Sequence, residues 1–108
     1  MKKALKKSKK LKIGYKEYDL ISTKDPRCEG ESVNGSINFR TEKIAIKSNL
    51  KGSTRAQVLF HEVVHAIDDY LVIGLNEDKT DKIAKGFTLF LIENKELVKE
   101  ILQLEEEK

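Results

Sequence analysis

The chain has few of the features that mark secreted or membrane-spanning proteins. Its 108 residues include one proline, Pro26, and one cysteine, Cys28. A single cysteine cannot form an internal disulfide, which suits a reducing compartment, so we expect a cytoplasmic protein. No apolar run approaches the roughly 20 residues that a transmembrane helix needs. The lysine-rich start is followed by no apolar segment, so we expect no secretory signal there.

The charges are distributed unevenly. The basic residues of the first twelve positions are Lys2, Lys3, Lys6, Lys7, Lys9, Lys10 and Lys12. Without these seven, the 21 basic and 18 acidic side chains of the whole chain become 14 and 18, a net charge of −4. We therefore expect a basic arm, residues 1–9, that is disordered because like charges repel, and a single domain, residues 10–108. Such an arm could contact nucleic acid non-specifically through phosphates.

Histidine is also scarce, and both histidines lie in one pentapeptide, His61-Glu62-Val63-Val64-His65. Residues four apart share one face of a helix, with Cβ atoms about 6 Å apart. Their two imidazoles can therefore reach one Zn²⁺ at about 2.0–2.1 Å. Glu62, rotated by about 100° from His61, can reach a water molecule beside the metal without being a ligand itself. The spacing thus predicts a catalytic zinc site.

The residues around the pentapeptide predict a helix of about 18 residues. Ser53 or Thr54 is expected as its N-cap, and Thr54 with Gln57 fits a capping box. Gly74 is the expected stop. Apolar side chains cover most of the circumference, so the helix should be buried on several sides. These side chains are Val58, Leu59, Phe60, Val63, Val64, Ala66, Ile67 and Leu71.

A catalytic zinc needs a third protein ligand and an open position for water. Because both histidines are used and Cys28 stands alone, that ligand has to be a carboxylate. A second helix is predicted to start at Asn76, and it carries Glu77 and Asp81 on one face. One can bind the metal while the other accepts a hydrogen bond from a ligating histidine. Acidic residues also favour helix N-termini without any metal, through the macrodipole, so that alternative stays open.

The pentapeptide, followed by Glu77-x-x-x-Asp81-x-x-Ala84, resembles the gluzincin clan of zinc metallopeptidases. The short gap between the two motifs is similar to that of the minimal, single-domain members called minigluzincins. Residues 59–68, 74–77 and 84–87 are also similar to small phage- and prophage-encoded metallopeptidases of bacteria, distant relatives of the ImmA/IrrE type. The resemblance covers roughly residues 33–97 and is most specific at the two metal-binding motifs.

The resemblance implies a zinc peptidase in which His61, His65 and Glu77 hold Zn²⁺. Glu62 would be the general base, and Asp81 would orient a ligating histidine. Asp81 stays the alternative third ligand, because in an antiparallel second helix it could lie closer to the level of the histidines. No sequence feature picks out the group that stabilises the oxyanion; Tyr70, one turn beyond His65, is a candidate.

Upstream of the motif helix, alternating apolar and polar residues predict strands at 11–15, 18–20, 36–40 and 43–47. The last two are expected to form a hairpin through residues 41–42. Residues 22–31 are expected as a loop and Asn34-Gly35 as a turn. Downstream of Asn76, helical spacing with a break at Asn94 predicts two helices. The expected fold class is α+β, a small N-terminal antiparallel sheet packed on the motif helix, with two further helices after it.

The expected activity is hydrolysis of peptide bonds by a metal-activated water. In zincins, an edge strand beside the metal commonly binds extended peptide by backbone pairing, and Lys43–Lys47 is the strand expected to do so. Two alternatives belong to other classes. The first is a non-catalytic, zinc-containing binding module, although a structural site has no need of Glu62. The second is a phage-type protein that associates with nucleic acid through its lysine-rich arm. We expect no membrane partner.

Overall fold

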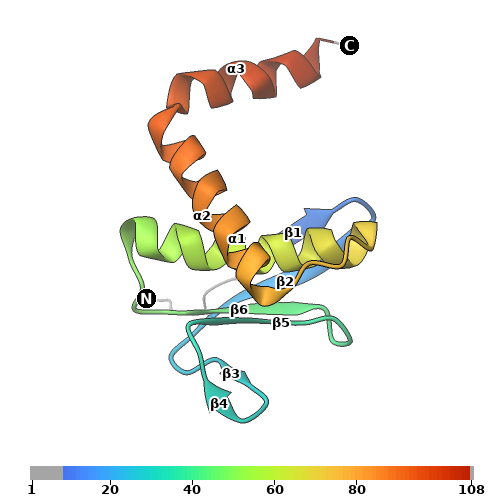
Figure 1. Ribbon diagram of the computed structural model, residues 1–108, viewed down its shortest axis with the longest axis vertical. Coiled ribbons are helices and arrows are strands. Elements are labelled where there is room, and N and C mark those ends of the chain that lie inside the picture. The colour runs from blue at the N-terminus through green and yellow to red at the C-terminus, as the bar shows by residue number, and fades with distance from the viewer. Residues whose placement is uncertain (1–8, 108) are drawn as a thin grey trace, which may run out of the picture.

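The computed structural model describes residues 9–107 and confirms the α+β class (Figure 1). A four-stranded sheet comes first, in the order β1-β2-β6-β5, and three helices follow. Its strands are β1 (Lys9–Ile13), β2 (Lys16–Thr23), β5 (Gly35–Asn38) and β6 (Lys43–Lys47). A two-stranded hairpin of β3 (Arg27–Cys28) and β4 (Glu31–Ser32) projects from the sheet. The helices are α1 (Gly52–Leu71), α2 (Glu77–Glu93) and α3 (Lys95–Glu106).

The sheet is mixed, so the prediction that it is purely antiparallel is wrong. β1–β2 and β5–β6 are antiparallel pairs, but β2 and β6 run parallel, with Leu20 opposite Ile44. Alternating hydrophobicity identifies a strand but not its partner, because pairing depends on where the chain returns. Here the chain leaves β2 for the β3–β4 hairpin and returns through β5, which inserts β6 between β5 and β2.

The segment predicted as a loop, residues 22–31, is largely ordered. Its first residues extend β2 to Thr23, and Arg27–Cys28 pairs with Glu31–Ser32. Asp25 ties this hairpin together, since its carboxylate accepts hydrogen bonds from Ser32 Oγ at 2.7 Å and from Arg27 Nε at 2.9 Å. Because polar contacts hold this hairpin, its segment lacks the alternation of apolar residues from which strands are predicted.

The position of β6 also corrects the prediction for peptide binding. Lys43–Lys47 is paired on one side with β2 and on the other with β5, so it offers no free edge. Within residues 9–107, the free edge on this side of the sheet belongs to β5. Ile44 and Ile46 of β6 are both buried in the core, which is consistent with a central strand.

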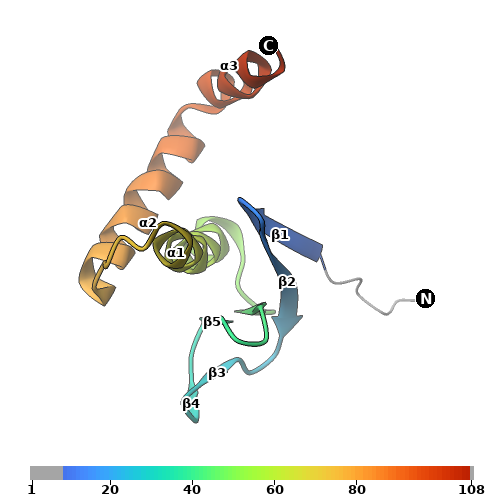
Figure 2. The ribbon, with the colours of Figure 1, turned by 90° about the vertical axis from the view of Figure 1, so that its right-hand side faces the viewer.

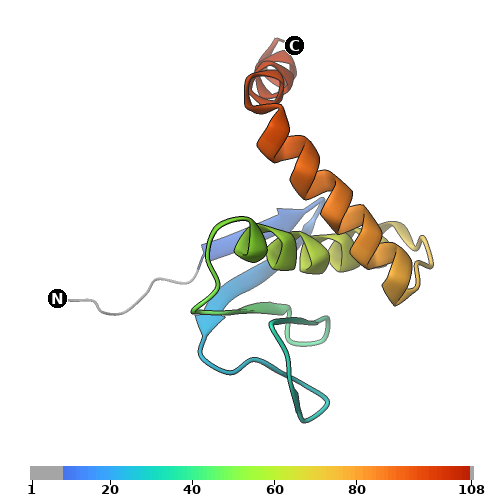
Figure 3. The same cartoon turned by 60° about the vertical axis from the view of Figure 1, so that its left-hand side comes forward.

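The core lies between one face of the sheet and α1. Tyr18, Ile44, Ile46 and Ala66 form the buried cluster. In β6 the inward Ile44 and Ile46 alternate with Lys43, Ala45 and Lys47, as the period of two requires. Helix α1 lies across this face, and α2 packs on the opposite side of α1 (Figures 2 and 3). α1 is therefore covered from two directions, as its wide apolar surface predicts.

The helix ends differ in how well they were predicted. α1 begins at Gly52 with Lys51 as N-cap and no side-chain cap, so the expected cap at Ser53 or Thr54 is wrong. Arg55 instead fastens this end to the sheet by donating to the carbonyl oxygen of Lys47 at 3.1 Å. For α2 the prediction is confirmed, because Asn76 accepts a hydrogen bond from the Lys79 main-chain nitrogen at 2.8 Å. The break at Asn94 is confirmed as the boundary between α2 and α3.

The predicted basic arm lies almost entirely outside the described residues. Lys9, its last residue, is the first residue of β1 and pairs with Leu20. None of the helices in residues 9–107 combines the length and the apolar character needed to cross a membrane.

Candidate metal centre

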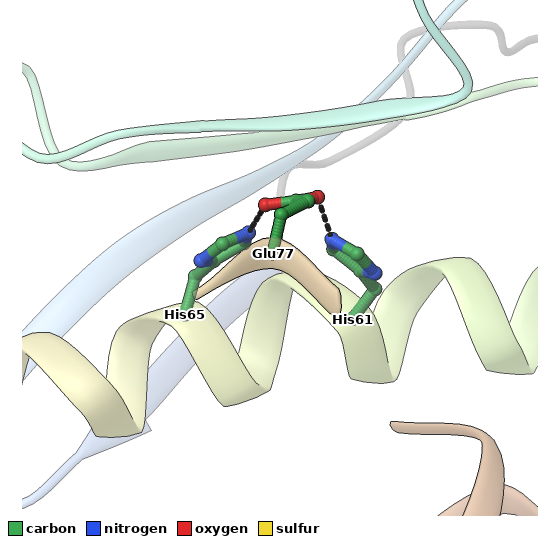
Figure 4. A group of neighbouring side chains, drawn as sticks. All are labelled: His61, His65 and Glu77. Atoms are coloured by element: carbon green, nitrogen blue, oxygen red, sulfur yellow. Dashed lines mark hydrogen bonds and ion pairs between the residues drawn. The ribbon is translucent and has the colours of Figure 1, made fainter. Parts of the chain in front are cut away.

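The two histidines of α1 face the first residue of α2 (Figure 4). His61 Nε2 lies 2.7 Å from Glu77 Oε2, and His65 Nε2 lies 3.2 Å from Glu77 Oε1. The carboxylate of Glu77 therefore bridges the two imidazoles. The two rings stand edge to face, with centroids 4.9 Å apart, as neighbours one helical turn apart on a common face do.

These three side chains fit a metal ion. One ligand atom from each lies within 4.8 Å of the other two. Ligands held tetrahedrally at about 2.0–2.1 Å from zinc are roughly 3.3 Å apart, so little movement is needed. The Glu77 side chain is 72% exposed and can make that movement without disturbing the core. Two imidazoles and one carboxylate are a donor set typical of catalytic zinc, because a fourth position stays open.

Asp81 lies on the outer side of the same cluster. Its Oδ1 is 3.4 Å from His61 Nδ1, the ring nitrogen that faces away from Glu77, and its Oδ2 is 3.2 Å from Lys85 Nζ. The hydrogen bond with Lys85, assisted by His61, lowers the pKa of Asp81. Asp81 is thus placed to orient a histidine, whereas Glu77 alone reaches both Nε2 atoms. The difference arises because α2 meets α1 at its very first residue, so Asp81 lies one turn farther along.

Glu62 is buried, with 5% of its surface exposed, and it lines the same cleft as the histidines. Burial raises the pKa of its carboxyl from 4.5 to about 7, although the neighbouring His61 opposes the shift. Gly35 of β5 lies directly against this carboxylate. A Cβ at Gly35 would fall 3.1 Å from Glu62 Oε2 and 2.7 Å from Val58 Cγ1. Only glycine leaves this room, so β5 can approach the base closely.

Burial also acts on His65, whose pKa it lowers. The neutral imidazole is the form that binds metals, since protonation removes the lone pair. The protein environment of His65 therefore favours the ligand form at neutral pH.

The centre opens into a cleft of ≈ 470 Å³. His61, Glu62 and His65 line it from α1, while β5 and the start of α2 contribute the remaining sides together with the β3–β4 hairpin. Cys28, for which no role was predicted, is exposed and lines this cleft. The cleft is large enough for several residues of an extended peptide.

Tyr70 does not belong to the cleft. Its ring packs edge to face on Tyr15, with centroids 5.0 Å apart, and covers Gly14, where a Cβ would overlap it. Its proposed role at the oxyanion therefore has no geometric support. The sequence does not predict the place of Gly35 beside Glu62. Asn34-Gly35 carries only a turn signal, and the close approach of β5 to α1 depends on the tertiary fold.

No family model, no curated protein and no solved structure matches the chain. The residues of the centre and their geometry are therefore the observations that point to a function.

Proposed function

We propose that the chain is a zinc-dependent metallopeptidase of the gluzincin type, which hydrolyses peptide bonds at the His61–His65–Glu77 centre. The observation that carries the proposal is the combination of this donor set with a buried carboxylate, Glu62, in one open cleft. A purely structural zinc site is closed by four protein ligands and has no use for a base. Here three ligands and a base share a cleft.

The residues present fit zinc as the metal. His61 and His65 would bind through Nε2 and Glu77 through its carboxylate, while Asp81 fixes the ring of His61 through Nδ1. When bound, zinc would supply a Lewis acid that lowers the pKa of a water molecule towards about 7 and polarises the scissile carbonyl.

Glu62 would move the proton. Its carboxylate faces the cleft from the helix that carries both histidines, and it accepts the proton from the attacking water. It then delivers the proton to the nitrogen of the leaving amine. A base with a pKa close to the working pH suits both steps, and burial shifts Glu62 in that direction.

The substrate would be an extended peptide bound along β5. This strand lies at the edge of the sheet within residues 9–107 and lines the cleft through Gly35, Ser36 and Ile37. Its free main-chain groups can pair with a peptide as an added strand. Because Gly35 lies close to the Glu62 carboxylate, a peptide on this edge would pass close to the base.

Cleavage of a quenched fluorescent peptide library by the zinc-loaded chain tests the proposal. The parent should cleave, and Glu62→Gln should retain zinc while losing activity by about 10²–10⁴-fold, because only proton transfer is removed. Glu93→Gln, in the last turn of α2, is the control for the same chemical change. If Glu62→Gln cleaves as fast as the parent, the mechanism is wrong. A parent that holds zinc but cleaves nothing favours the binding-module alternative.

A further inference from the structure

We infer that Asp68 is a positioning residue of the metal centre: it fixes the α1–α2 connection in the conformation that brings Glu77 to the two histidines. The inference rests on the proposed function, because it takes His61, His65 and Glu77 as metal ligands.

All main-chain N–H groups of residues 72–75, the connection between α1 and the N-cap Asn76, donate to Asp68. Val72 and Ile73 donate to its carbonyl oxygen, Ile73 at 3.1 Å. Gly74 donates to its Oδ1 at 2.7 Å, and Leu75 to its Oδ2 at 3.2 Å. Asp68 alone thus accepts hydrogen bonds from every main-chain N–H group of the connection.

The connection would not keep this shape unaided. Val72 has φ 54° and Gly74 has φ 89°, both in the left-handed region. That region is costly for a β-branched residue such as Val72, and it persists only where the surroundings hold it. Hydrogen bonds to an ionised carboxylate are stronger than those between neutral groups, so the Asp68 side chain is suited to hold it.

The shape of the connection decides where Glu77 points. Glu77 follows Asn76 directly and is the first residue of α2, and its side chain is 72% exposed, so packing does little to aim it. Its carboxylate reaches the histidines because the path of the main chain places the start of α2 beside His61 and His65. Asp68 lies three residues after His65 on α1, so it joins the part of the centre that carries the histidines to the part that carries Glu77.

Competition with a chromophoric chelator measures the zinc affinity of the full chain and of its variants. Asp68→Ala should weaken zinc binding by about 10–100-fold, the range found when a residue that orients a ligand is lost. Asp69→Ala is the matched control, since Asp69 is the exposed neighbour and its side chain makes no hydrogen bond within residues 9–107. Asp68→Asn should lie between the parent and Asp68→Ala, because its amide oxygen still accepts one hydrogen bond.

A double-mutant cycle separates positioning from other effects. The Asp68 carboxylate also acts on His65 through its charge, and its loss destabilises the end of α1. Neither effect needs Glu77. Glu77→Ala leaves only the weak zinc affinity of the two histidines, which titration at high zinc concentration can measure. If Asp68 acts by placing Glu77, Asp68→Ala should change this residual affinity far less than it changes the affinity of the parent. An equal loss in both backgrounds would overturn the inference.

Gly74→Ala disturbs the same connection without altering the carboxylate. An added Cβ there meets nothing within 4 Å, so its effect comes from strain at φ 89° alone. It should also weaken zinc binding, whereas Gly86→Ala, which is likewise unobstructed, should not. In the zinc-free chain, Asp68→Ala should accelerate amide hydrogen exchange at Gly74 and Leu75.

The outcomes keep the two claims apart. A parent chain that binds no zinc contradicts the proposed function, and amide exchange then decides on Asp68 alone. Unchanged exchange at Gly74 and Leu75 in Asp68→Ala, or zinc affinity equal to the parent's, contradicts the role of Asp68.

Discussion

Gly35 of β5 faces the carboxylate of Glu62 of α1, and the absence of a side chain at Gly35 is what leaves room for this close approach. A Cβ at that position would fall 3.1 Å from Glu62 Oε2. The edge of the sheet therefore approaches the motif helix closely at the residue expected to act as the base. This contact joins the edge that would bind a peptide to the group that would take the proton.

Gly35→Ala should destabilise the fold by about 1–3 kcal/mol, as overpacking of a well-packed site does. The added methyl also meets Val58 Cγ1 at 2.7 Å, so β5 or α1 has to shift. We expect peptidase activity to fall while zinc stays bound, because the atoms nearest to the added methyl belong to Val58, Glu62 and Ile46 and to none of the proposed ligands. Gly86→Ala, measured alongside by thermal unfolding, should be neutral or stabilising. A Gly35→Ala protein with the parent's stability and activity would show that this contact is unimportant.

The two carboxylates of α2 should differ in their effect on the metal. Glu77→Ala removes a ligand and should abolish tight zinc binding, whereas Asp81→Ala should weaken it by only about 10–100-fold. Asp78→Ala is the control, since Asp78 pairs only with Lys82, at 3.1 Å, within the described chain. Isothermal titration with zinc gives all three affinities. The reverse order, with Asp81 essential and Glu77 dispensable, would contradict the ligand set.

The metal-free protein should depend on pH through Glu62. Its folded-state pKa of about 7 lies above the ordinary 4.5, so the folded chain binds the proton more tightly than the unfolded chain does. This contribution to stability is therefore full below about pH 4.5 and is lost as pH rises towards 7. The total is at most a few kcal/mol, at about 1.4 kcal/mol for each pKa unit.

Ionisation of the buried Glu62 carboxyl lowers the stability of the parent at high pH. Glu62→Gln cannot ionise and should not lose stability in this way. In a chelator-containing buffer, its free energy of unfolding should exceed the parent's at pH 8 and approach it at pH 4.5. Denaturant melts of both proteins across this range measure the difference, and the other carboxylates cancel because both proteins share them. A parent that is the more stable of the two at pH 8 would show that Glu62 is not destabilised by burial.

Much of this site could be predicted because its signals are local. Two histidines four apart must share a helix face, and Asn76 followed by acidic residues marks a helix start. The order of the strands in the sheet could not be predicted, because the parallel pairing of β2 with β6 depends on where the chain returns after the β3–β4 hairpin. Lys43–Lys47, expected at an edge of the sheet, therefore lies between two strands. That Glu77 and not Asp81 faces both Nε2 atoms depends on how the chain connects α1 to α2, where Gly74 donates to the Asp68 carboxylate. No local sequence pattern specifies that connection.

Removal of residues 1–8 should leave the fold and the metal centre intact. Every core residue and every proposed ligand lies within residues 9–107, and the cut spares Lys9, which pairs with Leu20 in the sheet. Melting temperature and zinc content should match those of the full chain. Any affinity for nucleic acid should be lost with the arm and fall steeply with added salt. A large drop in melting temperature would show that these residues contribute to the domain.

The metal content of the purified chain tests the central claim most directly. After exposure to zinc and dialysis, elemental analysis should find one zinc ion per chain in the parent and none in His61→Ala or His65→Ala, because one imidazole and one carboxylate leave zinc too few ligands. Circular dichroism should show both variants folded, since His61 and His65 lie at the cleft and outside the buried core. A parent without zinc, or histidine variants that hold as much as the parent, would contradict the account.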